Sequence, residues 1–172
     1  KSSTFKSYGL TAYSNLLIIV DQSSNSILDS SNGNLLFYGA EGDSSSGGTV
    51  SGHYFYSASS SVSITNVYCI DLDALKIVWS DSISNYDFQV NPIIHNGIMY
   101  LVGGNAVFLY NALTGEKLGW CYGKAYSSSS FFGNKILVYN GDTMIINSPA
   151  SSMFAVKMDY SLDKNGKLVR NR

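Results

Sequence analysis

Residues 91–123, NPIIHNGIMYLVGGNAVFLYNALTGEKLGWCYG, form one complete repeating unit of the chain. The segment contains four short runs that are rich in β-branched and aromatic residues: Pro92–Ile94, Ile98–Val102, Val107–Asn111 and Lys117–Cys121. Turns at Asn96–Gly97, Gly103–Gly104 and Thr114–Gly115 separate the runs, and their Gly and Asn residues supply the positive φ of tight turns. The segment therefore predicts a four-stranded antiparallel sheet.

The same plan recurs along the chain. The last turn of each unit falls at Gly33, Leu75, Gly115 and Gly166, at intervals of about 40 to 50 residues. No stretch shows the sustained i, i+3, i+4 apolar spacing of an amphipathic helix. We expect one all-β domain over residues 1–172, a β-propeller-type array of four blades with four antiparallel strands each, and an irregular β-sandwich is the alternative. The repeats are expected at about residues 8–40, 47–82, 88–123 and 125–170, with an insertion in the last.

The composition excludes some classes of partner. Of the 172 residues, 45% are hydrophobic and only 13% are charged, and the net charge is −1. A chain with that charge balance has no electrostatic attraction to nucleic acid. No apolar run approaches the ~18 residues of a membrane span. Because hydroxyl and amide groups replace charges, we expect an extracellular or cell-surface setting, and a start at Lys1 without Met suggests a piece of a longer product.

Two segments resemble a known repeat family. VFLYNALTGEKLGW, residues 107–120, resembles the blade motif of the pyrroloquinoline-quinone-type (quinoprotein-like) β-propellers, in which a strand ends near an Asp, a Thr-Gly turn follows, and the next strand closes on a Trp. VYCIDLDALKIVW, residues 67–79, is similar, although Leu75 replaces the turn Gly. The resemblance implies that the Asp caps the turn and that the Trp packs between neighbouring blades. The motif positions in this chain are Asp29, Gly33, Asp71, Trp79, Asn111, Gly115, Trp120, Asp159 and Gly166.

The number of repeats is itself informative. Members of the resembled family usually close a ring with seven or eight blades, whereas this chain supplies four. An incomplete ring leaves unpaired sheet edges and an apolar flank that needs a cover. Two chains could pair, further blades could lie on another polypeptide, or four blades could close alone. We therefore expect a protein partner or self-association to complete the propeller.

The resemblance also raises the question of redox chemistry. It implies, for quinoprotein dehydrogenases, pyrroloquinoline quinone with calcium, a catalytic Asp and a disulfide between adjacent cysteines. Here Cys69 and Cys121 are far apart in the sequence, and they either form one disulfide or remain as two free thiols. The two histidines, His53 and His95, belong to no Cys/His cluster of zinc spacing. We expect no catalytic residues, no metal site and no cofactor, with the quinone and calcium as the alternative.

The predicted function is that of a non-catalytic, extracellular or cell-surface module that binds a protein or ligand, or supports assembly. A fragment of a quinoprotein-type oxidoreductase and a structural subunit of a surface layer or filament are the alternatives. Tyr86, Tyr122 and Tyr126 lie beside Ser and Asn near expected turns. Tyrosines in such places suit contacts with proteins or carbohydrate, or else they fill gaps between blades.

Overall fold

The described part of the protein is built entirely from β-strands and turns. In a computed structural model, the described residues are 7–21, 25–39, 44–60, 64–84, 91–103, 106–122, 135–139, 143–148 and 152–171. Over these ranges no helix is present, so none is long and apolar enough to cross a membrane.

The first three repeats each form a four-stranded antiparallel sheet with the strands in sequence order, which we call blades 1 to 3. Blade 1 contains β1 (Ser7–Tyr13), β2 (Leu16–Asp21), β3 (Asn25–Asp29) and β4 (Leu35–Gly39). Blade 2 contains β5 (Ser44–Ser51), β6 (Tyr54–Ser60), β7 (Ile64–Asp71) and β8 (Lys76–Ser84). Blade 3 contains β9 (Ile93–His95), β10 (Ile98–Gly103), β11 (Ala106–Asn111) and β12 (Lys117–Tyr122).

The fourth repeat, blade 4, departs from this plan. Its strands β13 (Lys135–Tyr139), β14 (Thr143–Ser148) and β15 (Ser152–Lys157) form a three-stranded sheet. A break at Met158–Asp159 then separates β15 from a two-stranded hairpin, β16 (Tyr160–Leu162) and β17 (Leu168–Arg170). The insertion that the sequence suggests in the last repeat therefore coincides with a blade whose hydrogen bonding is divided into two sheets.

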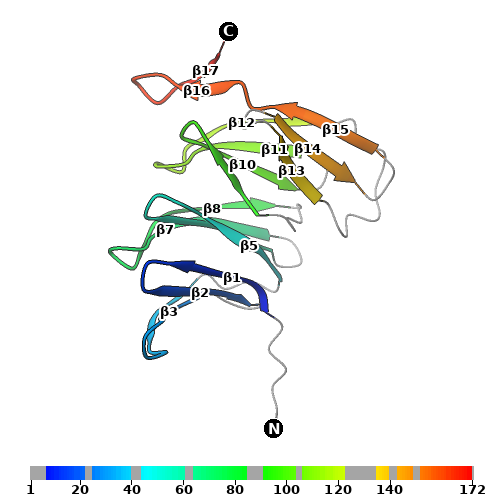
Figure 1. Ribbon diagram of the computed structural model, residues 1–172. Coiled ribbons are helices and arrows are strands. Elements are labelled where there is room, and N and C mark those ends of the chain that lie inside the picture. The colour runs from blue at the N-terminus through cyan, green and yellow to red at the C-terminus, as the bar shows by residue number, and fades with distance from the viewer. Residues whose placement is uncertain are drawn as a thin grey trace.

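The sheets stack face to face in chain order, from blade 1 near the N-terminus to blade 4 near the C-terminus (Figure 1). The first strands of successive blades contact one another, β1 against β5 and β5 against β9. These strands therefore follow one edge of the stack, which is the arrangement of the inner strands of a propeller. The all-β, propeller-type fold predicted from the sequence is confirmed, and the stack of sheets is not closed into a ring.

The hydrophobic core lies between the blades. We call the face of a blade that packs on the preceding blade its incoming face, and the face that packs on the following blade its outgoing face. Each interface joins the outgoing face of one blade to the incoming face of the next, so that both sheets bury apolar side chains. Ile18 and Ile27 of blade 1 pack with Phe55 and Ile70 of blade 2. Two further buried clusters follow the same alternation of apolar residues along each strand: one lies between blades 2 and 3, and the other lies between blade 3 and the β16–β17 hairpin.

The interface between blades 2 and 3 also carries polar contacts. The Tyr110 hydroxyl donates to Asp81 Oδ2 at 2.9 Å, and the Thr49 hydroxyl donates to the Pro92 carbonyl at 2.5 Å. Burial, and then the hydrogen bond to Asp81, raises the pKa of Tyr110 above its usual value, so Tyr110 stays a neutral donor. These bonds join named atoms of the two sheets, and they fix how blade 3 sits on blade 2.

Candidate functional site

The closing turn of a blade, between its third and fourth strands, is capped by a side chain. In blade 2, Asp71 Oδ1 accepts the backbone N–H groups of Asp73 and Ala74, both at 2.9 Å. These bonds, first that of Ala74, lower the pKa of Asp71 below its usual value. Asn111 of blade 3 caps its turn in the same way, because an amide oxygen accepts the backbone N–H groups as a carboxylate does.

The cap of the last repeat is Asp163, and the assignment of this position to Asp159 is wrong. Asp163 Oδ1 accepts the N–H groups of Asn165 and Lys167, and the Asp163 carbonyl accepts the N–H of Gly166. Asp159 instead forms an ion pair with Arg170 at 2.7 Å. The strand break before β16 shifts the turn along the chain, which spacing from the earlier repeats did not reveal.

Asp29 of blade 1 holds a closing turn of the same form. Its Oδ1 accepts the N–H of Ser31 at 2.8 Å, and its carbonyl accepts the N–H of Gly33. Gly33, Gly115 and Gly166 have φ of +75°, +74° and +77°, while Leu75 holds the same place in blade 2 with φ of +50°. A non-Gly residue rarely adopts this conformation. Leu75 packs against the core between blades 1 and 2, which offsets part of the strain.

Trp79 of β8 joins blade 2 to the closing turn of blade 3. Its Nε1–H donates to the Ala112 carbonyl at 2.9 Å, and its ring stacks on Tyr110 with centroids 6.1 Å apart and planes at 9°. A Cβ added to Gly115 would lie 2.5 Å from Trp79 Cδ2. The turn therefore needs Gly115 for two reasons, its positive φ and the closeness of the indole.

Trp120 does not take the equivalent place in blade 3. Trp79 pairs with Cys69 across the sheet, and the corresponding residue of blade 3, paired with Leu109, is Gly119. A β-bulge lies between this position and the closing turn in both blades, and its unpaired residue is Val78 in β8 and Leu118 in β12. Trp120 is one position later, and it is 51% exposed. A shift of one residue places a side chain on the opposite face of a strand.

Cys69 is a free thiol in β7, fully buried between blades 2 and 3. Burial raises the pKa of this thiol to about 12. A thiol with that pKa is a packing residue at neutral pH and a poor nucleophile. Cys121 lies in β12, the outermost strand of blade 3, and its side chain is outside the described ones.

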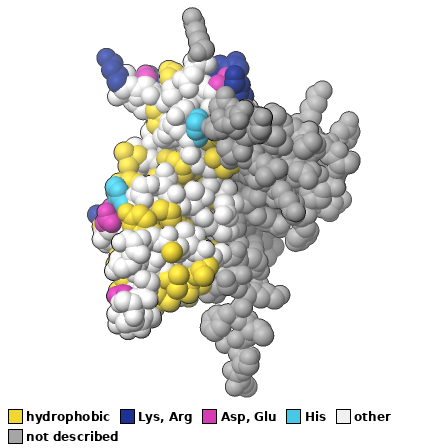
Figure 2. Space-filling view, in the orientation of Figure 1, with side chains coloured by type: hydrophobic (Ala, Val, Ile, Leu, Met, Phe, Trp, Pro, Cys, Tyr) yellow, Lys and Arg dark blue, Asp and Glu magenta, His cyan; other side chains and the backbone are white. Residues whose placement is uncertain are grey.

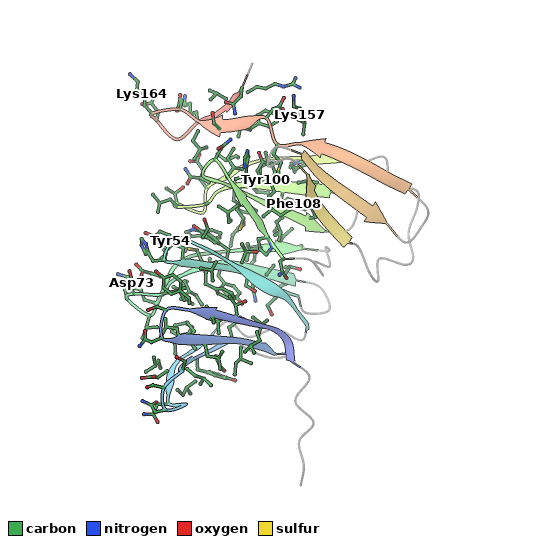
Figure 3. All side chains as sticks on the ribbon, viewed as in Figure 1. Tyr54, Asp73, Tyr100, Phe108, Lys157 and Lys164 are labelled. Atoms are coloured by element: carbon green, nitrogen blue, oxygen red, sulfur yellow. The ribbon has the colours of Figure 1, made fainter. Side chains whose placement is uncertain are left out.

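The structure brings three possible metal ligands together that the sequence separates. One ligand atom each of His53, Asp71 and Asp73 lies within 4.8 Å of the others. The Leu72 N–H donates to the His53 carbonyl and so joins the first turn of blade 2 to its closing turn. Asp73 marks the tip of that turn in Figure 3, and Figure 2 shows a His beside acidic side chains on this edge. The Asp71 carboxylate caps the closing turn, which explains this residue without an ion.

The turns of blades 2, 3 and 4 border an open groove of about 490 Å³. Its walls include His53 and Tyr54, whose ring centroids are 4.0 Å apart, and the exposed Leu113. Of the other residues that the sequence singles out, Tyr86, Tyr126 and the side chain of Tyr122 lie outside the described part. His95 contacts only its neighbour Asn96 among the hydrogen bonds that the structure shows for its ring.

The face of blade 1 that points away from blade 2 is apolar and partly open. Strand pairing joins Leu10 to Ile19, Leu17 to Leu28, and Leu28 to Leu35, so these side chains share one face of the sheet. Leu10 is 64% exposed and Leu35 is 58% exposed. Figure 2 shows hydrophobic side chains at the surface near this end of the stack. We call this face the blade 1 flank, and it consists of Leu10, Leu17, Ile19, Leu28, Leu35 and Tyr38.

The same positions are buried in the blades that have a predecessor. Leu17 is the second residue after the first turn of its blade, as are Phe55 in blade 2 and Met99 in blade 3. Phe55 and Met99 are both 0% exposed, whereas Leu17 is half-buried. Leu28, which precedes the cap Asp29, is also half-buried, while its equivalent Ile70 is 0% exposed. The blade 1 flank is thus the face that packs against the preceding blade in blades 2 and 3, and no blade among the described residues covers it.

Comparison with solved structures shows the same architecture. BamB from Moraxella catarrhalis matches with a TM-score of 0.67 at 16% identity, over 93% of this chain and 46% of that chain. The Dos1 propeller matches with a TM-score of 0.66 at 15% identity, over 98% of this chain and 46% of that one. The quinohemoprotein alcohol dehydrogenase ADHIIG from Pseudomonas putida HK5 matches with a TM-score of 0.65 at 16% identity, over 93% of this chain and 33% of that one.

These matches identify the fold as that of a β-propeller and nothing finer. The chain spans from about a third to about half of the length of the matched proteins. No protein-family model and no curated protein matches the sequence.

Proposed function

We propose that this chain is a non-catalytic protein-interaction scaffold whose blade 1 flank binds another propeller blade. The observation that carries the proposal is the contrast between Leu17 and Leu28, which are partly exposed, and the fully buried residues at the same positions of the next blades. A contiguous apolar face of this kind marks an interaction site. Because the flank has the pattern of an incoming face, the occupant that fits it is a sheet with an apolar outgoing face.

The length of the chain supports the same occupant. Two copies of this chain would match nearly the whole of a protein such as BamB, since one copy covers 46% of it. In a solution of the isolated chain, the blades of a second copy are the available cover. We therefore infer that the isolated chain self-associates through the blade 1 flank, and that in its natural setting the flank is covered by the blades that complete the ring.

The experiment is a measurement of mass against concentration by analytical ultracentrifugation. The chain is expected to associate as its concentration rises. Leu10→Lys is expected to shift the equilibrium to the monomer, because burial of an unpaired charge in the interface has a large free-energy cost. Leu113→Lys is the matched control, since Leu113 is 57% exposed but lies on a turn of blade 3. A wild-type monomer at all concentrations, or equal effects of the two substitutions, contradicts the proposal.

Two finer properties belong to the proposal. We infer that the repeats are of the pyrroloquinoline-quinone type, supported by the matching positions of Asp71 and Trp79, and that the module works at a cell surface or outside the cell, supported by the low charge content. A chain of this kind needs no cofactor. Red-shifted absorbance together with calcium-dependent dye reduction by the purified chain would instead favour the fragment of a quinoprotein-type oxidoreductase.

A further inference from the structure

A small cavity lies between blade 3 and the β16–β17 hairpin. Its volume is about 180 Å³, below the ~300 Å³ at which pockets for drug-sized ligands begin. The space therefore suits one ring or two fused rings. Its walls are aromatic and aliphatic, from Tyr100, Tyr160, Leu109 and Leu168, and Gly119 and Trp120 of β12 border it.

The cavity exists because a glycine replaces the indole that fills the preceding interface. Gly119 lines it and corresponds in register to Trp79. A Cβ added to Gly119 would meet no atom within 4 Å, so its side of the strand is open space. One interface earlier, Trp79 crosses to the next blade and stacks on Tyr110. The occupant that this geometry suits is thus a planar aromatic group of indole size.

The polar groups around the cavity indicate which aromatic group fits. Tyr100 is 1% exposed, and its hydroxyl has no hydrogen-bond partner within the part of the chain that the structure describes. Lys157, an exposed cation, forms part of the wall. The charge of Asp159 acts on both Tyr100 and Lys157, and Arg170 balances this carboxylate by an ion pair at 2.7 Å. Figure 3 labels Tyr100 in blade 3 and Lys157 at the end of β15, on the two sides of this interface.

The geometry points to a binding site at this cavity for a small aromatic carboxylate of indole size. The ring lies against Tyr100 and Tyr160, beside Gly119, in the place that the motif Trp would fill. The carboxylate faces Lys157, and a polar atom of the ligand pairs with the Tyr100 hydroxyl. The site lies at the opposite end of the described stack from the blade 1 flank, so binding does not depend on completion of the ring.

The test is a titration of ¹⁵N-labelled protein with indole-3-acetate, followed by the backbone N–H signals of Gly119 and Trp120, which line the cavity, and by the side-chain N–H signal of Trp79. The backbone signals of Gly119 and Trp120 are expected to shift in a saturable way. The Trp79 signal is expected to stay in place, because its N–H is held by the Ala112 carbonyl in another interface. Tryptamine, with the same ring and the opposite charge, is expected to bind at least about fivefold more weakly.

Two variants locate the site. Gly119→Phe puts a ring of the protein itself into the cavity and is expected to abolish the saturable shift, with an unchanged Trp79 signal as the check that blades 2 and 3 remain folded. Tyr100→Phe keeps the shape but removes the hydroxyl, and a weakening of about fivefold is expected from the loss of one hydrogen bond. Tyr54→Phe, which lies outside the cavity, is the control and is expected to bind as the wild type does.

Three results would overturn the proposal. The first is that the backbone signals of Gly119 and Trp120 do not move at saturating indole-3-acetate. The second is retained binding in Gly119→Phe, which would place the ligand elsewhere. The third is equal affinity for indole-3-acetate and tryptamine, or for the wild type and Tyr100→Phe, which would show that the polar groups named here do not take part.

Discussion

Replacement of Trp79 by Ala tests how the blades are held together. The indole is partly buried, stacks on Tyr110 and donates one hydrogen bond to the Ala112 carbonyl at 2.9 Å. Removal of a fully buried Trp side chain costs about 3–5 kcal/mol. Because Trp79 is only partly buried, we expect Trp79→Ala to lower the free energy of unfolding by about 2–4 kcal/mol. Trp79→Phe keeps a stacking ring and loses the hydrogen bond, for an expected loss of about 1 kcal/mol.

Trp120→Ala is the matched control from the same chain. Trp120 is 51% exposed, and substitutions at such sites usually change stability by about 0.5 kcal/mol. Urea unfolding followed by far-UV circular dichroism measures both variants, at protein concentrations low enough for the monomer to dominate. At about 2–4 °C per kcal/mol for a chain of this size, Trp79→Ala should melt at least about 4 °C lower than the wild type. Equal losses in Trp79→Ala and Trp120→Ala would refute the assignment of the blade-joining role to Trp79 alone.

Three further predictions concern the turns and the core. Gly115→Ala should destabilise the protein by about 2–3 kcal/mol, because the new methyl group clashes with Trp79 and the residue keeps an unfavourable positive φ. Gly33→Ala has nearly the same φ but open space around it, so it should cost about 1 kcal/mol in the same unfolding assay. Similar losses in the two variants would contradict the close approach of the indole to Gly115. Asp71 has a lowered pKa in the folded state, so its contribution is present above about pH 4 and disappears as the pH falls through the folded pKa. Asp71→Asn should therefore keep the turn but reduce the acid-induced loss of stability, and an unchanged pH profile would count against the cap. Cys69, with its pKa raised to about 12, should resist a thiol reagent at pH 8 until the protein is unfolded, and rapid labelling of the native protein in a variant without the other cysteine would show that the site is open.

Much of the fold could be predicted because it depends on local patterns. In residues 91–123, the positions of Gly and Asn mark each turn, and the runs between them match β9 to β12 within one or two residues. The closing turns of the middle blades follow from a short side chain with an oxygen acceptor, which is why both Asp71 and Asn111 satisfy the pattern. Such signals lie within a few residues of the structure that they determine.

The positions that sequence patterns misplaced depend on register. Trp120 matches the motif by residue type, but the β-bulge in β12 assigns the blade-facing position to Gly119. Asp159 matches by distance from the strand, but the break before β16 moves the cap to Asp163. The turn cap is better located by its distance from the turn Gly. The Asp or Asn that caps the turn lies four residues before this Gly in blades 1 and 3 and three residues before it in the last repeat, because the turn itself sets that spacing.

The candidate sites are contacts between blades or between turns, and so the sequence gives little sign of them. His53 meets Asp71 because the first turn of blade 2 is hydrogen-bonded to its closing turn. The cavity at Gly119 needs the blade 4 hairpin to complete its wall. The blade 1 flank stands out only when Leu17 is compared with Phe55, its buried equivalent.

The most direct test of the central claim is carbene footprinting of the chain at low and high concentration. We predict that labelling of Leu10, Leu28 and Leu35 on the blade 1 flank falls as the concentration rises, because another blade covers them. Labelling of Leu113 on the closing turn of blade 3 should stay constant. Equal labelling of the flank at both concentrations, in a sample whose mass shows association, would contradict the claim that this face is where the unfinished propeller joins its partner.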